Sequence, residues 1–233
     1  MLKIDFHVHT VLSKHSLLGR LKMADGLNTP AEMVKAAAKK GLDGIAITDH
    51  NILFDSYLAK KLTAKYHIAV LPGIELKFNK KDVIIIGIKR VPKVNSLPAL
   101  QEEVHRQGGI LIAPHPYDPL GRGYKAFNCF DAIEVVNAFK PYGYAKLLEA
   151  AERLKKAAVC GSDAHYAHHL GWAYCLADAE PNLKSIITAV KERKVNPVYG
   201  KVPLYGHLWY YTQKYAIGKS FLKPALRHLQ ELP

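Results

Sequence analysis

The sequence predicts an α/β fold in which parallel strands, joined by helices, close into a barrel. Seven apolar, β-rich runs alternate with segments of helical pattern, as expected of strands connected by crossover helices. Several runs are apolar on both faces, which is typical of buried parallel strands. The length of 233 residues suits one such domain better than two separate cores. The runs lie near Leu2 to Val8, Gly44 to Thr48, Ala69 to Ile74, Val83 to Ile88, Ile110 to Pro114, Ala132 to Val136 and Ala158 to Gly161.

The helix between the first two runs has the clearest boundaries. Thr29 is its predicted cap, Pro30 is its first residue and Glu32 completes a capping box. Gly41 marks its end. Three further helices are predicted from similar signals, from Ser96 to Gly108, from Tyr144 to Lys156 and from Asn182 to Arg193.

The end of the chain differs from the rest in composition. From Tyr199 to Pro233 the sequence turns aromatic and basic. We therefore expect a single domain over residues 1–233, with a barrel core to about residue 198 and an extension over residues 199–233. Capping of the barrel is the favoured role for this extension, and subunit pairing or stacking on nucleotide bases are the alternatives.

The sequence predicts neither export nor a membrane span. The strongest apolar run, Val83 to Ile88, has the length of a strand, and no signal-peptide pattern opens the chain. Cys129, Cys160 and Cys175 show no paired spacing, so neither a disulfide framework nor a cysteine zinc site is expected. The prediction is a cytoplasmic protein with no membrane partner.

The formal net charge of +13 predicts a positive electrostatic field around the protein. Such a field attracts phosphorylated small molecules, nucleotides or nucleic acid. Lysine and arginine are spread along the chain rather than gathered in one block, so a solvated basic surface is an equally good interpretation. Charge alone does not choose among these partners.

Histidines and carboxylates stand at the carboxyl ends of the predicted strands. In a β/α barrel these ends open onto one face, so residues far apart in sequence converge there. Mixed imidazole and carboxylate ligation suits zinc, manganese or iron. Two or three such ions would activate a water and orient a phosphate, which predicts hydrolysis of phosphate esters. The residues at these ends are His7, His9, His50, Glu75, His115, Asp163 and His165.

Seven short motifs follow one another along the chain. They are DFHVHT from Asp5, SKHS around His15, GLDGIAITDHN from Gly41, PGIE ending at Glu75, APHP around His115, AIEVVN ending at Asn137 and GSDAH from Gly161. In this order they resemble the PHP family, the polymerase and histidinol phosphatase superfamily of metal-dependent phosphoesterases, from Met1 to about Tyr174. The resemblance implies a distorted seven-stranded (β/α)7 TIM-like barrel, in agreement with the strand count.

The resemblance also implies a role for each ligand. Asp5 and Asn137 are expected to orient ligands or water rather than to bind metal directly. Glu75 and Asp163 would hold the metal-bound catalytic water. The expected ligand sets are His7, His9, Glu75 and Asp163 for one metal, Glu75 and His115 for a second, and His15, His50 and His165 for a third.

One position departs from the family pattern. Trinuclear members carry a histidine just past the fourth strand, where DVIIIGI here runs into Lys89. A protonated lysine is a poor ligand, so the second metal would be weakly held, bound through water or absent. Lys89 could instead grip a substrate phosphate, or point to solvent if the alignment is shifted by a residue. Arg122 and Lys140, in loops on the expected active face, are further candidates for phosphate binding.

The predicted function is hydrolysis of a phosphomonoester or phosphodiester by a metal-activated water. The family implies a nucleotide, an oligonucleotide or a substrate like histidinol phosphate. A metal-dependent amidohydrolase is one alternative, because that barrel class also carries HxH on its first strand. A non-catalytic RNA-binding barrel related to the ribonuclease P protein subunit is the other, and the retained ligands disfavour it because that role needs no metal cluster.

Overall fold

The computed structural model describes residues 1–13, 26, 28–138, 140 and 143–199. All of them lie within one compact unit, Met1–Gly200. His15 with its SKHS motif, and the predicted extension beyond Tyr199, lie outside the described residues. The roles predicted for these segments therefore stay predictions.

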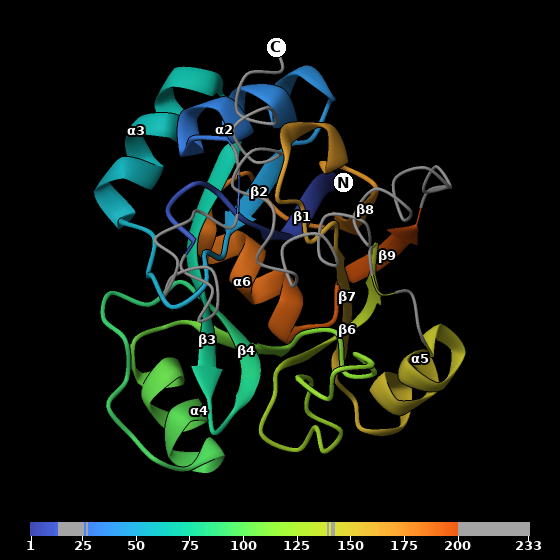
Figure 1. Cartoon of the computed structure of the whole chain (residues 1–233). Coiled ribbons are helices and arrows are strands. Elements are labelled where there is room, and N and C mark those ends of the chain that lie inside the picture. Colours follow the sequence, from blue (N-terminus) through green and yellow to red (C-terminus); the bar gives the residue numbers. More distant parts are fainter. Residues whose placement is uncertain (14–25, 27, 139, 141–142, 200–233) are drawn as a thin grey trace, which may run out of the picture. The chain divides into compact units, whose positions relative to one another are not determined.

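In the described part of the chain, nine strands form one sheet in the order β7-β6-β5-β4-β3-β2-β1-β8-β9 (Figure 1). A parallel bridge between Val8 and Ala164 also joins the end of β1 to the segment after β7, so the first seven strands nearly close into a barrel. The predicted α/β barrel is confirmed. The strands are β1 (Leu2–Val8), β2 (Gly44–Ile47), β3 (Ala69–Phe78), β4 (Lys81–Ile86), β5 (Ile110–Ala113), β6 (Ala132–Asn137), β7 (Ala157–Gly161), β8 (Ala173–Ala177) and β9 (Val195–Tyr199).

The four predicted helices are present, and the capping box of the first is complete. The Thr29 hydroxyl accepts a hydrogen bond from the Glu32 amide at 3.3 Å, and the Glu32 carboxylate accepts one from the Thr29 amide at 2.8 Å. A further helix, α3, was not predicted because only Ala59 and Leu62 of its residues are buried, which leaves a thin apolar stripe. The helices are α2 (Pro30–Lys39), α3 (Ser56–Tyr66), α4 (Leu97–Arg106), α5 (Tyr144–Arg153) and α6 (Leu183–Lys191), with a short 3-10 turn, η1 (Ala167–His169).

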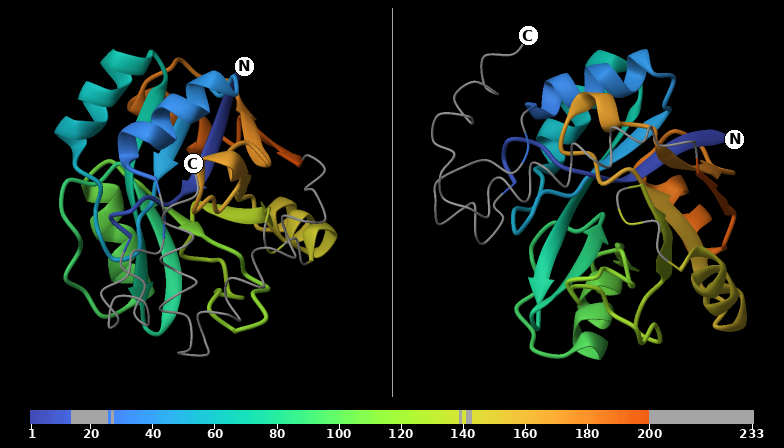
Figure 2. Two further views of the ribbon diagram at one scale, coloured as in Figure 1. Left: turned by 45° about the horizontal axis from the view of Figure 1, so that its top comes forward. Right: turned by 45° about the vertical axis from the view of Figure 1, so that its right-hand side comes forward.

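Helices α2 and α3 lie side by side and pack against β2 and β3 (Figure 2). Met33, Val34 and Leu62 of these helices meet Ile45 and Ile47 of β2 in a continuous apolar cluster. Full burial of a side chain of this size stabilises the fold by roughly 1.5–3 kcal/mol relative to exposure. This packing fixes the strands from whose ends the polar side chains project.

No described helix combines the length with the apolar character that a bilayer span requires.

The direction of β4 differs from the prediction of parallel strands. β3 and β4 form an antiparallel hairpin whose turn residues, Asn79 and Lys80, have φ of 49° and 66°. Positive φ at both positions gives a two-residue turn that matches the twist of the paired strands. β4 also runs antiparallel to β5. The apolar run over residues 83–86 carries no pattern that indicates direction, so the expected crossover was wrong at this strand.

Two strands go beyond the seven that were predicted. β8 pairs antiparallel with β1, and β9 pairs antiparallel with β8. β8 alternates buried with half-buried residues, and β9 contains Pro197 and is largely exposed, so neither forms a continuous apolar run. Both extend the sheet on the far side of β1 and leave the barrel of seven strands as predicted.

Candidate metal centre

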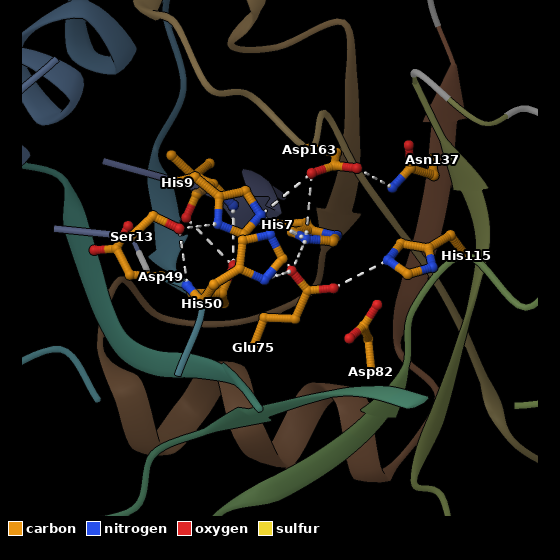
Figure 3. Close-up of polar contacts among 12 residues, drawn as sticks. His7, His9, Ser13, Asp49, His50, Glu75, Asp82, His115, Asn137 and Asp163 are labelled. Atoms are coloured by element: carbon orange, nitrogen blue, oxygen red, sulfur yellow. Dashed lines mark hydrogen bonds and ion pairs between the residues drawn. The ribbon is translucent and has the colours of Figure 1, made fainter. Parts of the chain in front are cut away.

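Of the side chains predicted to bind metal, those that the structure describes converge on one end of the barrel (Figure 3). His7 lies in β1 and His9 follows it, and their spacing of two residues places both rings on the same side of the chain. Both are fully buried. Glu75 lies in β3, and the others follow the ends of β2, β5 and β7. We call His7, His9, His50, Glu75, His115, Asp163 and His165 the cluster.

Four donor atoms of the cluster stand at the separations that one metal ion requires. Nε2 of His7 lies 3.0 Å from Nε2 of His9. The same His7 nitrogen lies 3.4 Å from Oε2 of Glu75 and 3.5 Å from Oδ1 of Asp163. Nε2 of His9 lies 3.3 Å from Oε2 of Glu75 and 3.2 Å from Oδ1 of Asp163. Donors about 2.0–2.1 Å from a tetrahedral ion lie about 3.3–3.4 Å from one another. These residues therefore fit a divalent metal.

A second group of donors adjoins the first. Ring nitrogens of His9, His50 and His165 lie within 4.8 Å of one another. Nδ1 of His50 also lies 3.0 Å from Oε2 of Glu75, and a backbone bridge joins the same two residues. His50 and His165 are each 8% exposed whereas His9 is 0% exposed, so this group lies nearer to solvent.

The other oxygen of Glu75 faces a third group. Its Oε1 lies 3.0 Å from Nε2 of His115, and Asp82 completes a set of donors within 4.8 Å of one another. Asp82 is buried; its Oδ1 accepts from Nζ of Lys77 at 2.7 Å, and its Oδ2 has no hydrogen-bond partner in the described part of the chain. Sequence reasoning missed Asp82, because the start of a parallel strand would lie at the far end of the barrel. The hairpin reverses β4 and brings its start to the cluster.

Glu134 in β6 is the second functional candidate that sequence reasoning missed. Its Oε1 lies 2.9 Å from Nδ1 of His7, and its Oε2 accepts from the amide of His115 at 2.7 Å. A carboxylate behind a ligating histidine fixes the tautomer and the direction of the ring. One signal in the sequence could have identified Glu134: it is a charged residue inside the apolar run of the AIEVVN motif. A carboxylate buried in such a strand needs a hydrogen-bonding or charged partner.

Asp5 and Asn137 lie behind the cluster, where an orienting role would place them. Nδ2 of Asn137 donates to Oδ2 of Asp163 at 3.1 Å. Asp5 accepts from the amides of Ser162 at 2.9 Å and His7 at 3.3 Å, and burial raises the pKa of its carboxyl to about 6. Asp5 thereby joins β1 to the backbone that leads into Asp163.

The backbone around the cluster adopts conformations that hold its side chains in position. Gly161 lacks a side chain, and a Cβ there would collide with the Cβ of His7 and lie 3.1 Å from Oε1 of Glu134. Asp163 and His115 have φ of 54° and 29°. Such backbone costs on the order of 1–3 kcal/mol and persists where the surroundings hold it, often at functional sites. Here it belongs to two residues whose side chains reach the cluster.

Charges within the cluster favour the ionised carboxylates that metal binding needs. Burial alone would raise the pKa of Glu75, but the charges of His50 and His7 outweigh it and hold that pKa well below its usual range. Burial likewise opposes ionisation of Asp163, but Lys140 and then His7 outweigh it and lower the pKa. Burial would lower the pKa of His7, yet the surrounding carboxylates, Asp163 first, raise it well above its usual value. This donor set therefore attracts positive charge, which a metal ion supplies.

Two of the three predicted phosphate-binding residues lie near the cluster. Nζ of Lys140 is 2.8 Å from Oδ2 of Asp163. Arg122 pairs with Asp118 at 2.6 Å, and Asp118 in turn lies 3.8 Å from Nδ1 of His115. Lys140 is thus the cation that touches a predicted metal ligand directly, whereas Arg122 reaches the cluster through Asp118.

The predicted place of Lys89, beside the second metal, is corrected by the structure. Because β4 runs antiparallel, its carboxyl end and Lys89 lie at the opposite end of the barrel from the cluster. Lys89 is exposed, and its amide donates to Oε1 of Gln107 at 2.9 Å. The residue of this strand that lies with the cluster's donors is Asp82.

Fold and cluster together define a class of protein, the β/α barrels that carry a metal-binding donor set at the carboxyl ends of their strands. The chain belongs to the PHP family: the family model of the PHP domain matches residues 5–169, and that of the PHP-associated region matches residues 145–195. The resemblance of the motifs to this family is thereby confirmed.

Several known proteins are similar to this chain in sequence or in fold. An uncharacterised protein of Methanocaldococcus jannaschii is 34% identical over 142 residues, which are 59% of this chain and 83% of that protein. The structure of a two-domain protein from Bacteroides vulgatus, containing a predicted PHP-like metal-dependent phosphoesterase, matches with a TM-score of 0.66 and 19% identity over 91% of this chain and 69% of its own. A lesion-specific endonuclease from Pyrococcus furiosus matches with a TM-score of 0.52 and 14% identity, over 82% of this chain and 56% of its own.

Proposed function

We propose that the protein is a metal-dependent phosphoesterase that hydrolyses a phosphomonoester or a phosphodiester. The observation that carries this proposal is the position of Glu75. Its Oε2 lies 3.4 Å from Nε2 of His7 and 3.3 Å from Nε2 of His9, and its Oε1 lies 3.0 Å from Nε2 of His115. A carboxylate between two groups of donors suits two neighbouring divalent ions, which is an arrangement used for displacement at phosphorus. Membership of the PHP family supports the same chemistry.

Two or three divalent ions are the proposed cofactors, with manganese, zinc or iron favoured by imidazole and carboxylate donors. In this proposal Glu75 is shared between the first two ions. The ligand sets are His7, His9, Glu75 and Asp163 for the first ion, Glu75, His115 and Asp82 for the second, and His50 and His165, with His15 expected from the sequence, for the third.

Bound ions would lower the pKa of a water held near Glu75 and Asp163 and would polarise the phosphate. The remaining tasks fall to the chain's own residues. Lys140, beside Asp163, places a positive charge where the phosphate oxygens gain negative charge. Glu134 and Asn137 hold ligand side chains in one orientation through their hydrogen bonds.

Hydrolysis of p-nitrophenyl phosphate and bis-p-nitrophenyl phosphate, with and without added manganese, tests this proposal. Chelator-treated protein should be inactive and should regain turnover when manganese or zinc is restored. Asp163→Asn should remain inactive under all conditions, whereas Asp178→Asn, which changes an exposed carboxylate of the same size, should behave as wild type. Turnover of an amide or a lactone without turnover of either phosphate ester would contradict the proposal.

A further inference from the structure

A cavity of about 420 Å³ lies between the loop that follows β5 and one side of α5. This volume is in the range of small-molecule and cofactor sites, roughly 300–1,000 Å³. Residues of the loop form one wall and residues of α5 form the other. The lining includes Tyr117, Lys125 and Phe127 from the loop, and Lys146, Glu149 and Arg153 from the helix.

The cavity carries an excess of positive charge. Lys125, Lys146 and Arg153 line it, against the single carboxylate of Glu149. Among the described residues several other cations form ion pairs, Arg122 among them, but Lys125, Lys146 and Arg153 do not. Their charges are therefore available to an anion, and the field of unpaired cations inside a concave wall concentrates there.

The positive charges are spaced along the helix. Lys146 and Arg153 are seven residues apart in α5, which is about 10 Å along the axis at about 1.5 Å per residue. Two charges at this separation suit an elongated anion with more than one phosphate better than a single phosphate group. At the end of the helix Nζ of Lys156 donates to the carbonyl of Asn128 at 3.0 Å, which ties the loop to the helix there.

One aromatic wall of the cavity comes from the segment that directly follows His115 of the cluster. Tyr117, two residues after His115, lines the cavity and is 37% exposed. It lies against Gly143, the cap of α5, where any Cβ would collide with its ring. Tyr144, the first residue of α5, is 45% exposed. A partly exposed ring such as Tyr117, in a wall that also carries cations, is a feature with which proteins hold bases and phosphates of single-stranded nucleic acid.

We infer that this cavity binds a single strand of nucleic acid, whose bases meet Tyr117 and whose phosphates meet Lys125, Lys146 and Arg153. The inference rests on the proposed phosphoesterase activity. The cluster would hydrolyse one phosphate of the strand, and the cavity would hold the part of the strand next to that phosphate. The inference assigns the substrate class: an oligonucleotide rather than a small phosphorylated metabolite.

Binding of labelled strands to the full-length protein tests the inference without depending on turnover. The probes are fluorescein-labelled ten-nucleotide strands of thymidine and of uridine with phosphorothioate linkages, and the readout is fluorescence anisotropy across a range of salt concentrations. The test variant is Lys146→Ala with Arg153→Ala. The matched control is Lys35→Ala with Lys39→Ala, which also removes two exposed cations from one helix and changes the net charge equally.

The cavity variant should bind strands more than about tenfold more weakly than wild type, and its slope of log affinity against log salt should fall by about 1.4, since each lost phosphate contact removes about 0.7. The control should stay within about twofold. In manganese, the cavity variant should also show a raised KM for the unmodified strand while its kcat/KM for p-nitrophenyl phosphate stays unchanged. A preference between thymidine and uridine strands would tell DNA from RNA within the same inference.

The two proposals fail in different ways. Equal weakening of strand binding by both double variants, with phosphate esters still hydrolysed, would overturn the cavity as a strand site and leave the phosphoesterase standing. Selective weakening by the cavity variant, with no ester or strand hydrolysed, would support the cavity and overturn the phosphoesterase. Competition by thymidine monophosphate as strong as that by an unlabelled strand would overturn the strand in favour of a mononucleotide.

Discussion

The two oxygens of Glu75 face two differently built halves of the cluster. On the Oε2 side, nitrogens of His7, His9 and His50 lie 3.0–3.4 Å away, from β1 and the segment after β2. On the Oε1 side the histidine at 3.0 Å is His115. The remaining donor of that group, Asp82, already accepts a hydrogen bond from Lys77. The first half has many donors at the spacing of a metal ion, and the second has few.

The supports of the two halves differ as well. Nδ1 of His7 is backed by Glu134 at 2.9 Å. Nδ1 of His115 has no hydrogen-bond partner among residues whose placement is described, and the carboxylate of Asp118 stands 3.8 Å from it. Because a ring held from behind is oriented before the metal arrives, we expect the first half to bind its ion tightly and the second to bind its ion weakly.

Glu75→Gln should have the largest effect, because it removes the charge that both halves share. We expect loss of metal from both halves and a fall in phosphate ester turnover of at least about 100-fold, more than the 10–100-fold typical of residues behind the ligands. Metal content by elemental analysis and turnover in manganese are the measurements. Glu102→Gln, at an exposed position in α4, is the matched control and should match wild type in both. Full metal content in Glu75→Gln would show that the shared carboxylate does not hold the ions.

His115→Ala should separate the two halves. It removes a donor from the second half alone, so we expect the protein to lose its weakly bound ion and to keep the ion of the first half. Isothermal titration of the chelator-treated protein with manganese should then show one binding phase fewer than wild type. His105→Ala, which removes a surface histidine paired with Asp131, is the control and should keep every phase. Equal loss of both ions in His115→Ala would mean that the halves are not independent.

Glu134→Gln tests the support of the first half. The amide keeps the shape of the carboxylate but loses its charge, so His7 should be held less firmly and manganese affinity should fall about 10–100-fold. Because Glu134 is proposed to act through His7, kcat at saturating manganese should change much less than the manganese concentration needed to reach it. A fall in kcat with unchanged metal affinity would place Glu134 in contact with substrate instead.

Thr29→Ala should have the smallest effect and separates instability from loss of metal. The substitution removes the cap of α2, which costs about 1 kcal/mol, with a range of about 0.5–2, and lowers Tm by about 2–4 °C in a domain of this size. Metal content and turnover at 25 °C should remain those of wild type. Loss of metal from this variant would show that global destabilisation alone empties the cluster, and the variants above would then need correction for stability.

Much of the barrel and of the cluster follows from the sequence because both depend on short-range patterns. The capping signal at Thr29 depends on residues within one turn and is confirmed in the structure. The convergence of His7, Glu75 and Asp163 follows from strand ends alone, because parallel strands of a barrel end on one face. Their service as metal ligands stays a proposal.

The features missed in the sequence depend on pairing between distant segments. The direction of β4 is set by the turn at Asn79 and Lys80, while the apolar strand that follows reads the same in either direction. Asp82 therefore seemed remote from the cluster, and Lys89 seemed close to it. Glu134 was missed because its partner, His7, is 127 residues away and no local spacing joins them.

Anomalous diffraction from crystals grown with manganese would test the central claim most directly. Data collected above and below the manganese absorption edge locate each ion without reference to any assumed ligand. The account predicts a strong peak between His7, His9, Glu75 and Asp163, and a weaker one on the His115 side of Glu75. Absence of a peak among the first four residues, in crystals of protein that hydrolyses phosphate esters, would contradict it.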